Sequence, residues 1–307
     1  MSALTSEFGK VAVLMGGWSA EREISLLSGK AVLTALQAQG VDAHAVDVDH
    51  DIATVLKEGK FERAFIVLHG RGGEDGTIQG LLSAMSIPYT GSRVLGSSLS
   101  MDKLRTKQIW LAAGLPTPDY CILNSEMDCA HAVKKVGLPL IMKPALEGSS
   151  IGMSKVTDES EMISAWQKAK ACGGVVIAER WITGKEYTAA ILNDRVLPMI
   201  RLETSHAFYD FDAKYKAEDT KYICPCGLSQ ETEIQLSLMI KQSFNAVDAS
   251  GWGRVDFMID QNNQPWLIEV NTVPGMTDHS LVPMAAKQAG INFEQLVIEI
   301  LRGTCCE

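Results

Sequence analysis

Asp256, Glu269 and Asn271 lie inside otherwise largely apolar segments of the stretch RVDFMIDQNNQPWLIEVNTVPGM. The stretch is typical of a β-hairpin, and Asn262–Asn263 is expected to form a two-residue turn because asparagine tolerates the positive φ that such turns require. This register places Asp256 opposite Glu269 and Arg254 opposite Asn271, with all four side chains on one face. The other face is expected to present Val255, Phe257, Ile268 and Val270.

Asp256 and Glu269 are like charges that face each other, so they need a positive partner. Two like charges about 4 Å apart near a protein surface repel by about 4 kcal/mol. Carboxylate and amide oxygens suit hard Mg²⁺ rather than zinc, and Mg²⁺ normally completes its coordination with water and substrate phosphates. The alternative is an exposed hairpin face whose acids are merely solvated. The metal interpretation is favoured, because Arg254 shares this face and the turn after Asn271 exposes backbone N–H groups, as an oxyanion site requires.

A lysine and a loop of small residues give a weaker sign of phosphate chemistry. Lys143 ends an apolar strand and precedes Gly148, Ser149 and Ser150, whose backbone N–H groups are suited to wrap around phosphate oxygens. Taken alone, the loop is more typical of an ordinary turn, and a lysine at a strand end usually extends to solvent. The chain contains no P-loop and no dinucleotide-binding glycine motif, so any nucleotide site must be of another type.

The composition is that of an ordinary soluble protein. The 307 residues are 46% hydrophobic and 21% charged, and the net charge of -9 argues against a nucleic-acid or anionic-membrane surface. Without a signal-peptide core or an apolar run near the roughly 18 residues of a membrane span, we expect a cytoplasmic protein with no nucleic-acid or membrane partner. The seven cysteines are expected to be free thiols, since Cys224-Pro-Cys226 lacks the second ligand pair that zinc requires.

Strands and helices divide the chain into three expected units. A strand at 10–15, a glycine turn, a helix at 21–39 and two further strands predict a parallel sheet covered by helices over residues 1–96. Prolines then break the chain, and alternating helices and strands predict a small α+β unit over residues 97–179. The hairpin lies in a third α+β unit over residues 180–307.

The chemistry-bearing segments together resemble the D-alanine:D-alanine ligases, a family of ATP-grasp enzymes. The segments GGWSAEREISL, LHGRGGEDG, YTGS, MDK, KPALEGSSIGMSK, FYDFDAKY and NTVPGMTDHSLVPMAA follow in the family's order over essentially the full length. GGxSxExxxS together with HGxxGEDG is specific to the ligases, whereas the ATP-grasp parts alone are less specific.

The resemblance implies a mixed α/β and α+β fold of ATP-grasp architecture, with an N-terminal parallel-sheet domain, a small central α+β domain and a C-terminal α+β domain. It implies that ATP drives the joining of two D-alanine molecules into D-alanyl-D-alanine through a D-alanyl phosphate, for peptidoglycan precursor synthesis. A symmetric homodimer is also expected.

By resemblance, the site residues fall into four groups. The ATP phosphates would contact Lys103, Lys143 and Lys214, the adenine would contact Glu179 and the backbone of Arg180, Trp181 and Ile182, and the ribose would contact Glu186. Two Mg²⁺ or Mn²⁺ ions would be held by Asp256, Glu269 and Asn271. The two D-alanine molecules would be bound by Glu21, His69, Ser280 and Leu281. The catalytic residues would be Glu21, Ser149, Tyr215, Arg254 and Gly275.

Two other functions compete with this one. A ligase of the same architecture would join D-alanine to D-lactate or another acceptor, and Tyr215 in FYDFDAKY is expected to favour D-alanine. A nucleotide- or metabolite-binding regulatory protein would lack catalysis, which the full set of catalytic residues disfavours. The loop 147–152 and the segment 203–222 are expected to close over bound substrates and to be mobile without them.

Overall fold

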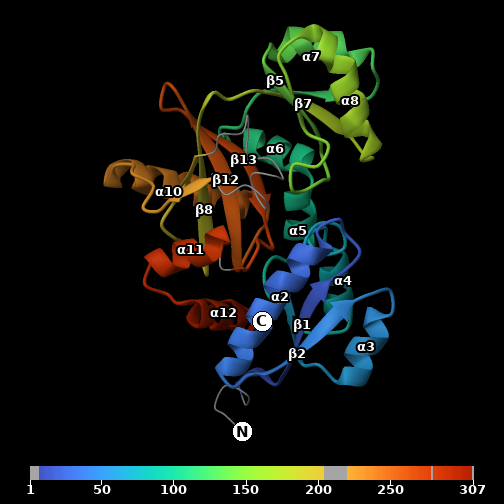
Figure 1. The fold of residues 1–307 in the computed structure, drawn as a ribbon, viewed down its shortest axis with the longest axis vertical. Coiled ribbons are helices and arrows are strands. Elements are labelled where there is room, and N and C mark those ends of the chain that lie inside the picture. The colour runs from blue at the N-terminus through green and yellow to red at the C-terminus, as the bar shows by residue number, and fades with distance from the viewer. Residues whose placement is uncertain (1–6, 204–219, 278, 306–307) are drawn as a thin grey trace.

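The computed structural model describes residues 7–203, 220–277 and 279–305. Lys214 and Tyr215 fall outside these ranges, so their expected roles stay predictions. The described elements form three sheets with helices around them (Figure 1). No helix within these ranges combines the length and the apolar character that a membrane span requires.

The N-terminal unit is built on a parallel sheet of order β2-β1-β3, as the alternation of strands and helices predicts. Its elements are β1 (Lys10–Gly16), α2 (Arg22–Ala38), β2 (Asp42–Val48), α3 (Ile52–Gly59), β3 (Arg63–Ile66), α4 (Thr77–Ala84) and α5 (Val94–Met101). Helix α6 (Lys103–Ala112) follows and leads to the central unit. The loops after the parallel strands lie at one edge of the sheet, where ligands bind in such folds.

Ser25 joins the ends of two strands at this edge. Its buried hydroxyl accepts a hydrogen bond from the Gly16 backbone N (2.9 Å) and donates one to the Val67 backbone O (2.7 Å). Gly16 has a φ of 80°, a conformation that glycine adopts without steric cost, so the chain turns sharply after β1. Ser25 therefore fixes the turn after β1 relative to the segment that ends at His69.

The central unit is an antiparallel sheet of order β4-β7-β5-β6 with its own core. Its elements are β4 (Tyr120–Leu123), α7 (Asp128–Val136), β5 (Leu140–Pro144), β6 (Ser154–Val156), a 3-10 turn η1 (Glu159–Glu161), α8 (Met162–Ala171) and β7 (Val176–Arg180). Because β5 and β7 are paired, Lys143 and Glu179 lie on neighbouring strands.

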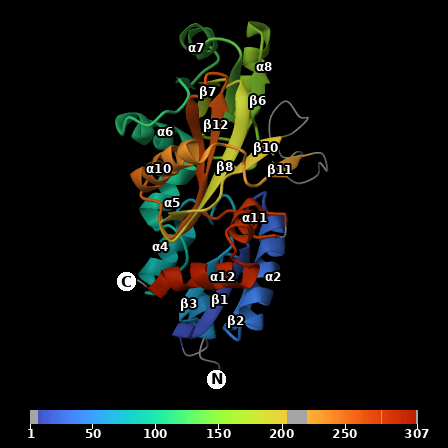
Figure 2. The ribbon, with the colours of Figure 1, turned by 90° about the vertical axis from the view of Figure 1, so that its left-hand side faces the viewer.

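The C-terminal unit is a six-stranded sheet of order β11-β10-β8-β12-β13, with β9 paired to β8. Its elements are β8 (Gly184–Leu192), β9 (Arg195–Val196), β10 (Ile200–Glu203), β11 (Lys221–Ile223), α10 (Gln230–Ala246), β12 (Trp252–Asp260), β13 (Pro265–Asn271), α11 (Leu281–Gln288), α12 (Phe293–Arg302) and η2 (Gly303–Cys305). Figure 2 shows α12 beside α2, and one buried core extends from the N-terminal sheet to α11 and α12. The C-terminal helices thus attach the third sheet to the first unit.

The hairpin β12–β13 has the predicted register where it matters for the chemistry. Arg254 pairs with Asn271, and Asp256 pairs with Glu269. The predicted two-residue turn is wrong, because only Asn263 of the two asparagines has a positive φ (62°) and the Asp260 N–H bonds to the Gln264 carbonyl (3.0 Å). Asp260 and Gln264 therefore close a three-residue turn, a form in which one turn residue takes the left-handed conformation.

A β-bulge offsets the longer turn. Phe257 pairs with Leu267, and the register shifts between Asp256 and Phe257. The expectation that Ile268 points into the core is therefore wrong: Leu267 is fully buried there, and Ile268 lines a cavity on the opposite face. The additional turn residue and the bulge cancel, so the acids still face each other.

We predict that Ser25→Ala lowers the free energy of unfolding by about 1–3 kcal/mol, because it leaves a buried backbone N–H and a buried carbonyl without their partner. The exposed Ser164→Ala in α8 is the control and should change it by at most about 0.5 kcal/mol. Urea titration of both variants measures the difference. Equal stability of the two variants would refute the role of Ser25.

Candidate active site

On the hairpin face, both carboxylate oxygens of Asp256 accept hydrogen bonds from neighbouring side chains. Its Oδ1 accepts hydrogen bonds from Arg254 Nε (2.8 Å) and Thr188 Oγ1 (2.6 Å). Its Oδ2 accepts from Arg254 Nη2 (2.7 Å) and Asn271 Nδ2 (3.0 Å). Both carboxylate oxygens are thus fixed, and the forked pair with Arg254 is the strong kind of charge-assisted hydrogen bond.

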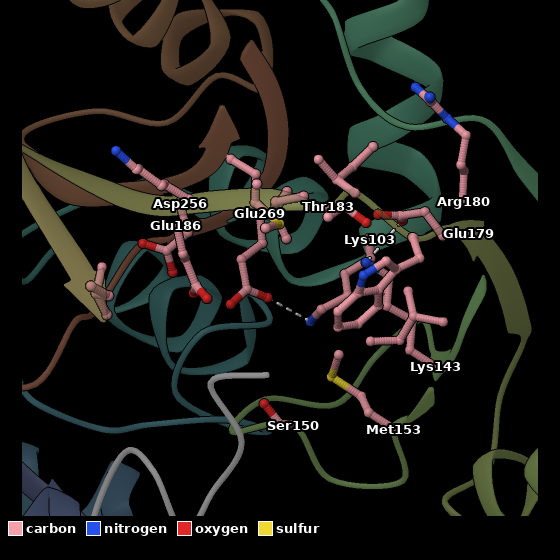
Figure 3. A pocket seen from close by; sticks show the side chains of 18 of the residues that line it. Lys103, Lys143, Ser150, Met153, Glu179, Arg180, Thr183, Glu186, Asp256 and Glu269 are labelled. Atoms are coloured by element: carbon pink, nitrogen blue, oxygen red, sulfur yellow. Dashed lines mark ion pairs between the residues drawn. The ribbon is translucent and has the colours of Figure 1, made fainter. Parts of the chain in front are cut away.

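Glu269 forms its ion pair with a lysine from another element. Lys103 Nζ lies 3.2 Å from Glu269 Oε2 and donates a hydrogen bond to the Glu147 backbone O (2.7 Å) (Figure 3). Lys103 is the first residue of α6 and is buried. Each acid of the facing pair therefore has its own positive partner in the protein, one from the hairpin itself and one from α6.

Two cavities border the hairpin face. The first has a volume of about 410 Å³ and is lined by Asp256 and Glu269. The second has a volume of about 500 Å³ and is lined by Arg254 and Asn271. The four predicted residues are thus brought together on one face and divided between two chambers, which suits a reaction between two separately bound molecules.

The first cavity has charged groups toward both ends and a partly apolar lining. Figure 3 shows the carboxylates of Glu186, Asp256 and Glu269 toward one end, and Glu179 and Lys143 toward the other. The apolar lining includes Ile141, Met153, Trp181, Leu202, Met258 and Ile268. An apolar slot beside a row of charged groups suits a planar base attached to a polyphosphate.

Glu179 is buried between two lysines. Its Oε2 lies 2.9 Å from Lys143 Nζ and 3.1 Å from Lys107 Nζ, and all three side chains are almost fully buried. Burial alone would raise the pKa of Glu179, but the two ammonium groups lower it below its usual value. Burial lowers the pKa of Lys107 to about 8, against the opposing effect of Glu179.

Part of the backbone at the predicted adenine site is already bonded within the protein. The N–H of Arg180 donates to the Asp119 carbonyl (2.8 Å), and the N–H of Trp181 donates to the Pro139 carbonyl (3.2 Å). These two donors extend the pairing of β7 with its neighbours, since Asp119 directly precedes β4 and Pro139 directly precedes β5. Among the three predicted backbone positions, Ile182 is therefore the one to which we assign an N–H contact with the base.

His69 lies in the wall of the second cavity with a defined tautomer. Its Nδ1 is 2.8 Å from the Val273 carbonyl, which only accepts hydrogen bonds, so Nδ1 has the proton. Burial lowers the pKa of His69 despite the nearby Glu21 carboxylate, so the ring is neutral at pH 7. No protein donor in the described part of the chain bonds to the buried Nε2, which is left as an acceptor for a ligand N–H.

Glu74 is a second ionisable group in this wall that the sequence analysis did not single out. Its Oε2 accepts from the Gly70 N–H (2.7 Å) and its Oε1 from the Val273 N–H (3.4 Å). Burial, followed by the nearby Glu21 carboxylate, raises the pKa of Glu74 to about 8. At neutral pH Glu74 is therefore mainly a neutral acid that joins the loop after β3 to the turn after β13.

The loop after β5 closes over both cavities. Ser149 donates a hydrogen bond to Glu21 Oε1, and Arg71 Nη2 bonds to Glu147 Oε1 at 2.6 Å. Ser149 and Ser150 have φ values of 47° and 60°, a conformation that costs energy in residues with a side chain. Ser149 lines the second cavity and Ser150 the first, so two adjacent residues contact both chambers.

The far end of the second cavity is formed by the turn after β13 and the start of α11. The Ser280 hydroxyl accepts from the Thr277 N–H (2.9 Å), and Leu281 begins the helix. An added Cβ at Gly275 would lie 3.0 Å from Ser280 Oγ, a tight contact that would require the serine side chain to move. A helix start provides N–H donors for a carboxylate.

Three residues with a part in these contacts were not singled out from the sequence. They are Glu74 in the wall of the second cavity, Lys107 against Glu179, and Thr188 against Asp256. Glu74 lies in LHGRGGEDG, a segment already quoted for the resemblance, and Lys107 follows Lys103 by four residues, the spacing of one helical face. No comparable sequence signal exists for Thr188, which reaches Asp256 because β8 pairs with β12.

The donor set at the hairpin matches a hard cation rather than a soft one. No cluster of three or more His, Cys, Asp or Glu side chains suited to a metal occurs in the described ranges. Asp256 and Glu269 instead combine two carboxylates with the amide of Asn271 on one strand-paired face. Oxygen donors of this kind, with room for phosphate oxygens beside them, fit Mg²⁺ or Mn²⁺.

Comparison with known proteins agrees with the geometry. Residues 52–92 match the domain family described as D-ala D-ala ligase N-terminus, and residues 109–302 match the one described as D-ala D-ala ligase C-terminus. The chain is 58% identical over 296 residues to the D-alanine--D-alanine ligase of Methylococcus capsulatus, with 96% of both chains covered. It is 59% identical over 294 residues to the same-named protein of Ectopseudomonas mendocina, with 96% of this chain and 94% of the relative covered.

Solved structures give the same result. The crystal structure of D-alanine--D-Alanine Ligase from Bacillus anthracis complexed with ATP is 30% identical, with a TM-score of 0.83 over 96% of this chain and 97% of that one. This likeness confirms the expected mixed α/β and α+β ATP-grasp fold. From the domain matches, the sequence identity and the shared fold, the chain belongs to the D-alanine:D-alanine ligase family.

Proposed function

We propose that the chain uses ATP to join two D-alanine molecules into D-alanyl-D-alanine, for peptidoglycan precursor synthesis. The observation that supports this most strongly is the division of the hairpin face between two cavities. Asp256 and Glu269 face the chamber suited to a nucleotide, and Arg254 and Asn271 face the chamber suited to small substrates. A phosphate and a carboxylate would therefore meet at this face.

The first D-alanine binds in the second cavity with its ammonium beside the Glu21 carboxylate. The bare Nε2 of His69 accepts a hydrogen bond from the same ammonium group. This placement turns the substrate carboxylate toward the hairpin face, where one of its oxygens attacks the γ-phosphorus of ATP. ADP leaves, and the product of this step is D-alanyl phosphate.

The second D-alanine completes the reaction. Its carboxylate binds Ser280 and the Leu281 N–H at the start of α11, and its neutral amine attacks the carbonyl carbon of the acyl phosphate. Arg254 and the Gly275 N–H stabilise the oxyanion that forms, a role that is worth about 3–4 kcal/mol for a well-placed donor. Phosphate then leaves with the former carboxylate oxygen, and the amine loses a proton.

ATP occupies the first cavity. Its phosphates lie along Lys103, Lys143 and Lys214, its ribose contacts Glu186, and its adenine contacts Glu179 and the Ile182 N–H. Asp256, Glu269 and Asn271 would hold two Mg²⁺ or Mn²⁺ ions, which neutralise the phosphate charge when bound. With nucleotide and metal present, the phosphates offer Lys103 an alternative partner to Glu269.

Acceptor choice, cellular location and assembly belong to the same proposal. Tyr215 would favour an amine acceptor over D-lactate, as its place in FYDFDAKY implies. The Tyr215→Phe variant should then raise depsipeptide formation relative to dipeptide at pH 7.5. A cytoplasmic homodimer is the expected form.

The direct test of this function is ATP turnover measured with and without D-alanine, with the product identified by mass. We expect phosphate release that depends on D-alanine and a product of the mass of D-alanyl-D-alanine. ATP binding without D-alanine-dependent turnover would instead support a regulatory nucleotide-binding protein.

We predict that Glu269→Gln lowers turnover by about 100-fold or more while the fold is retained, because the change removes a negative charge from a side chain that would hold the metal ions. The exposed Glu58→Gln in α3 is the matched control and should be fully active. EDTA should stop the unaltered enzyme, and Mg²⁺ or Mn²⁺ should restore it. A folded Glu269→Gln enzyme with near-normal turnover would contradict the metal assignment.

We also predict that the two serines of the closing loop affect different substrates. Ser149→Ala should raise the KM for D-alanine by about tenfold, because a hydrogen bond to the charged Glu21 is lost, and leave the KM for ATP nearly unchanged. Ser150→Ala, one residue away, should affect the KM for ATP more than that for D-alanine. Steady-state kinetics with each substrate varied in turn measures both effects, and identical effects of the two variants would be inconsistent with this division.

A further inference from the structure

Lys107 is a buried lysine to which the proposed function gives no role. It lies on α6 one helical turn after Lys103 and is fully buried. Its Nζ lies 3.1 Å from Glu179 Oε2 and donates a hydrogen bond to Thr117 Oγ1 at 2.6 Å. Thr117 in turn donates to the Leu267 carbonyl (3.0 Å), beside the bulge of the hairpin.

The charge of this cluster exceeds what neutralisation requires. The pair of Lys143 and Glu179 is already balanced, so Lys107 adds one uncompensated positive charge to the interior. The nearby acid Asp119 is exposed and lies 3.8 Å from Arg180 Nε, so it offsets little of this charge. Removing ions from water costs several kcal/mol each, so stability alone does not explain a third buried charge.

The geometry of Glu179 suggests what the additional charge does. Both lysines contact Oε2, which leaves Oε1 as the oxygen for a ligand in the first cavity. An ionised carboxylate only accepts hydrogen bonds, whereas a protonated one also donates. The state of Glu179 therefore decides which chemical group of a nucleotide base is accepted at this position.

We propose that Lys107 is a specificity-determining residue for the nucleotide base. Together with Lys143 it holds Glu179 as an ionised acceptor, so the cavity takes a purine with a 6-amino group and rejects one with a 6-oxo group. The 6-amino group donates to Glu179 Oε1, while a 6-oxo oxygen would face that oxygen without a proton between them. This inference rests on the proposed placement of adenine beside Glu179.

The test compares ATP with ITP, which has a 6-oxo purine and is otherwise the same nucleotide. Lys107→Met keeps the length and packing of the side chain, so the fold should be retained, but it leaves one ammonium group instead of two against the buried Glu179 carboxylate. We expect it to lower the ratio of kcat/KM for ATP to kcat/KM for ITP by about tenfold, mainly through a higher KM for ATP. The KM for D-alanine should not change.

Three further variants separate specificity from structure. Lys107→Gln should lower the ratio as Lys107→Met does, and it takes the place of Lys107→Met if that variant does not fold. Glu179→Gln should also lower the ratio, because an amide can donate to a 6-oxo group. Thr117→Val removes the other partner of Lys107 but keeps its charge, so this control should preserve the ratio within about twofold.

Two outcomes would overturn the inference. In the first, the folded Lys107 variants keep the ATP-to-ITP ratio of kcat/KM within twofold of that of the unaltered enzyme. In the second, they lose kcat/KM equally with both nucleotides. The second outcome would show a purely structural role. These outcomes differ from a failure of the proposed function, in which the unaltered enzyme would make no D-alanyl-D-alanine from ATP and D-alanine.

Discussion

The structure depends on holding two carboxylates face to face on one pair of strands. Asp256 and Glu269 are cross-strand neighbours, and their repulsion must be offset before the hairpin is stable. Arg254 binds the first from within the hairpin, and Lys103 reaches the second from the first residue of α6. The position of α6 is therefore a requirement of the hairpin as well as of the cavities. Metal ions held by these acids would add to the positive charge that Arg254 and Lys103 already place beside them.

Two other carboxylates, Glu179 and Glu74, show how the surroundings decide the charge of an acid. Glu179 has two buried lysines against one of its oxygens, and its pKa is lowered despite burial. Glu74 accepts hydrogen bonds from backbone N–H groups, and burial together with the nearby Glu21 carboxylate raises its pKa to about 8. At neutral pH the nucleotide cavity thus contains an ionised acceptor, whereas the substrate cavity contains a neutral acid that holds two loops together.

Much of the site could be predicted from the sequence because the governing patterns are local. The alternation along β12 and β13 placed Arg254, Asp256, Glu269 and Asn271 on one face. That register was right although the turn was wrong, because the bulge compensates for the longer turn. Neither the turn length nor the bulge follows from alternation, since both depend on how Leu267 packs and bonds against the segment at Pro116.

The residues that the sequence did not reveal act through contacts between distant segments. Lys107 and Thr188 acquire their roles only when α6 meets β7 and when β8 pairs with β12. The four-residue spacing places Lys107 on the same helical face as Lys103, but it does not show that the Lys107 side chain is buried. The raised pKa of Glu74 likewise depends on burial and then on the carboxylate of Glu21, a residue far earlier in the chain.

The most direct test of the acyl phosphate route follows a carboxylate oxygen of D-alanine through the reaction. The enzyme is given ATP and D-alanine labelled with ¹⁸O in its carboxylate, and the mass of the released phosphate is measured. If the substrate carboxylate attacks the γ-phosphorus, each released phosphate contains one ¹⁸O atom. This oxygen leaves with the phosphate when the amine of the second D-alanine displaces phosphate from the acyl phosphate. Unlabelled phosphate, formed together with D-alanyl-D-alanine, would contradict the acyl phosphate route and the meeting of the two cavities at the hairpin.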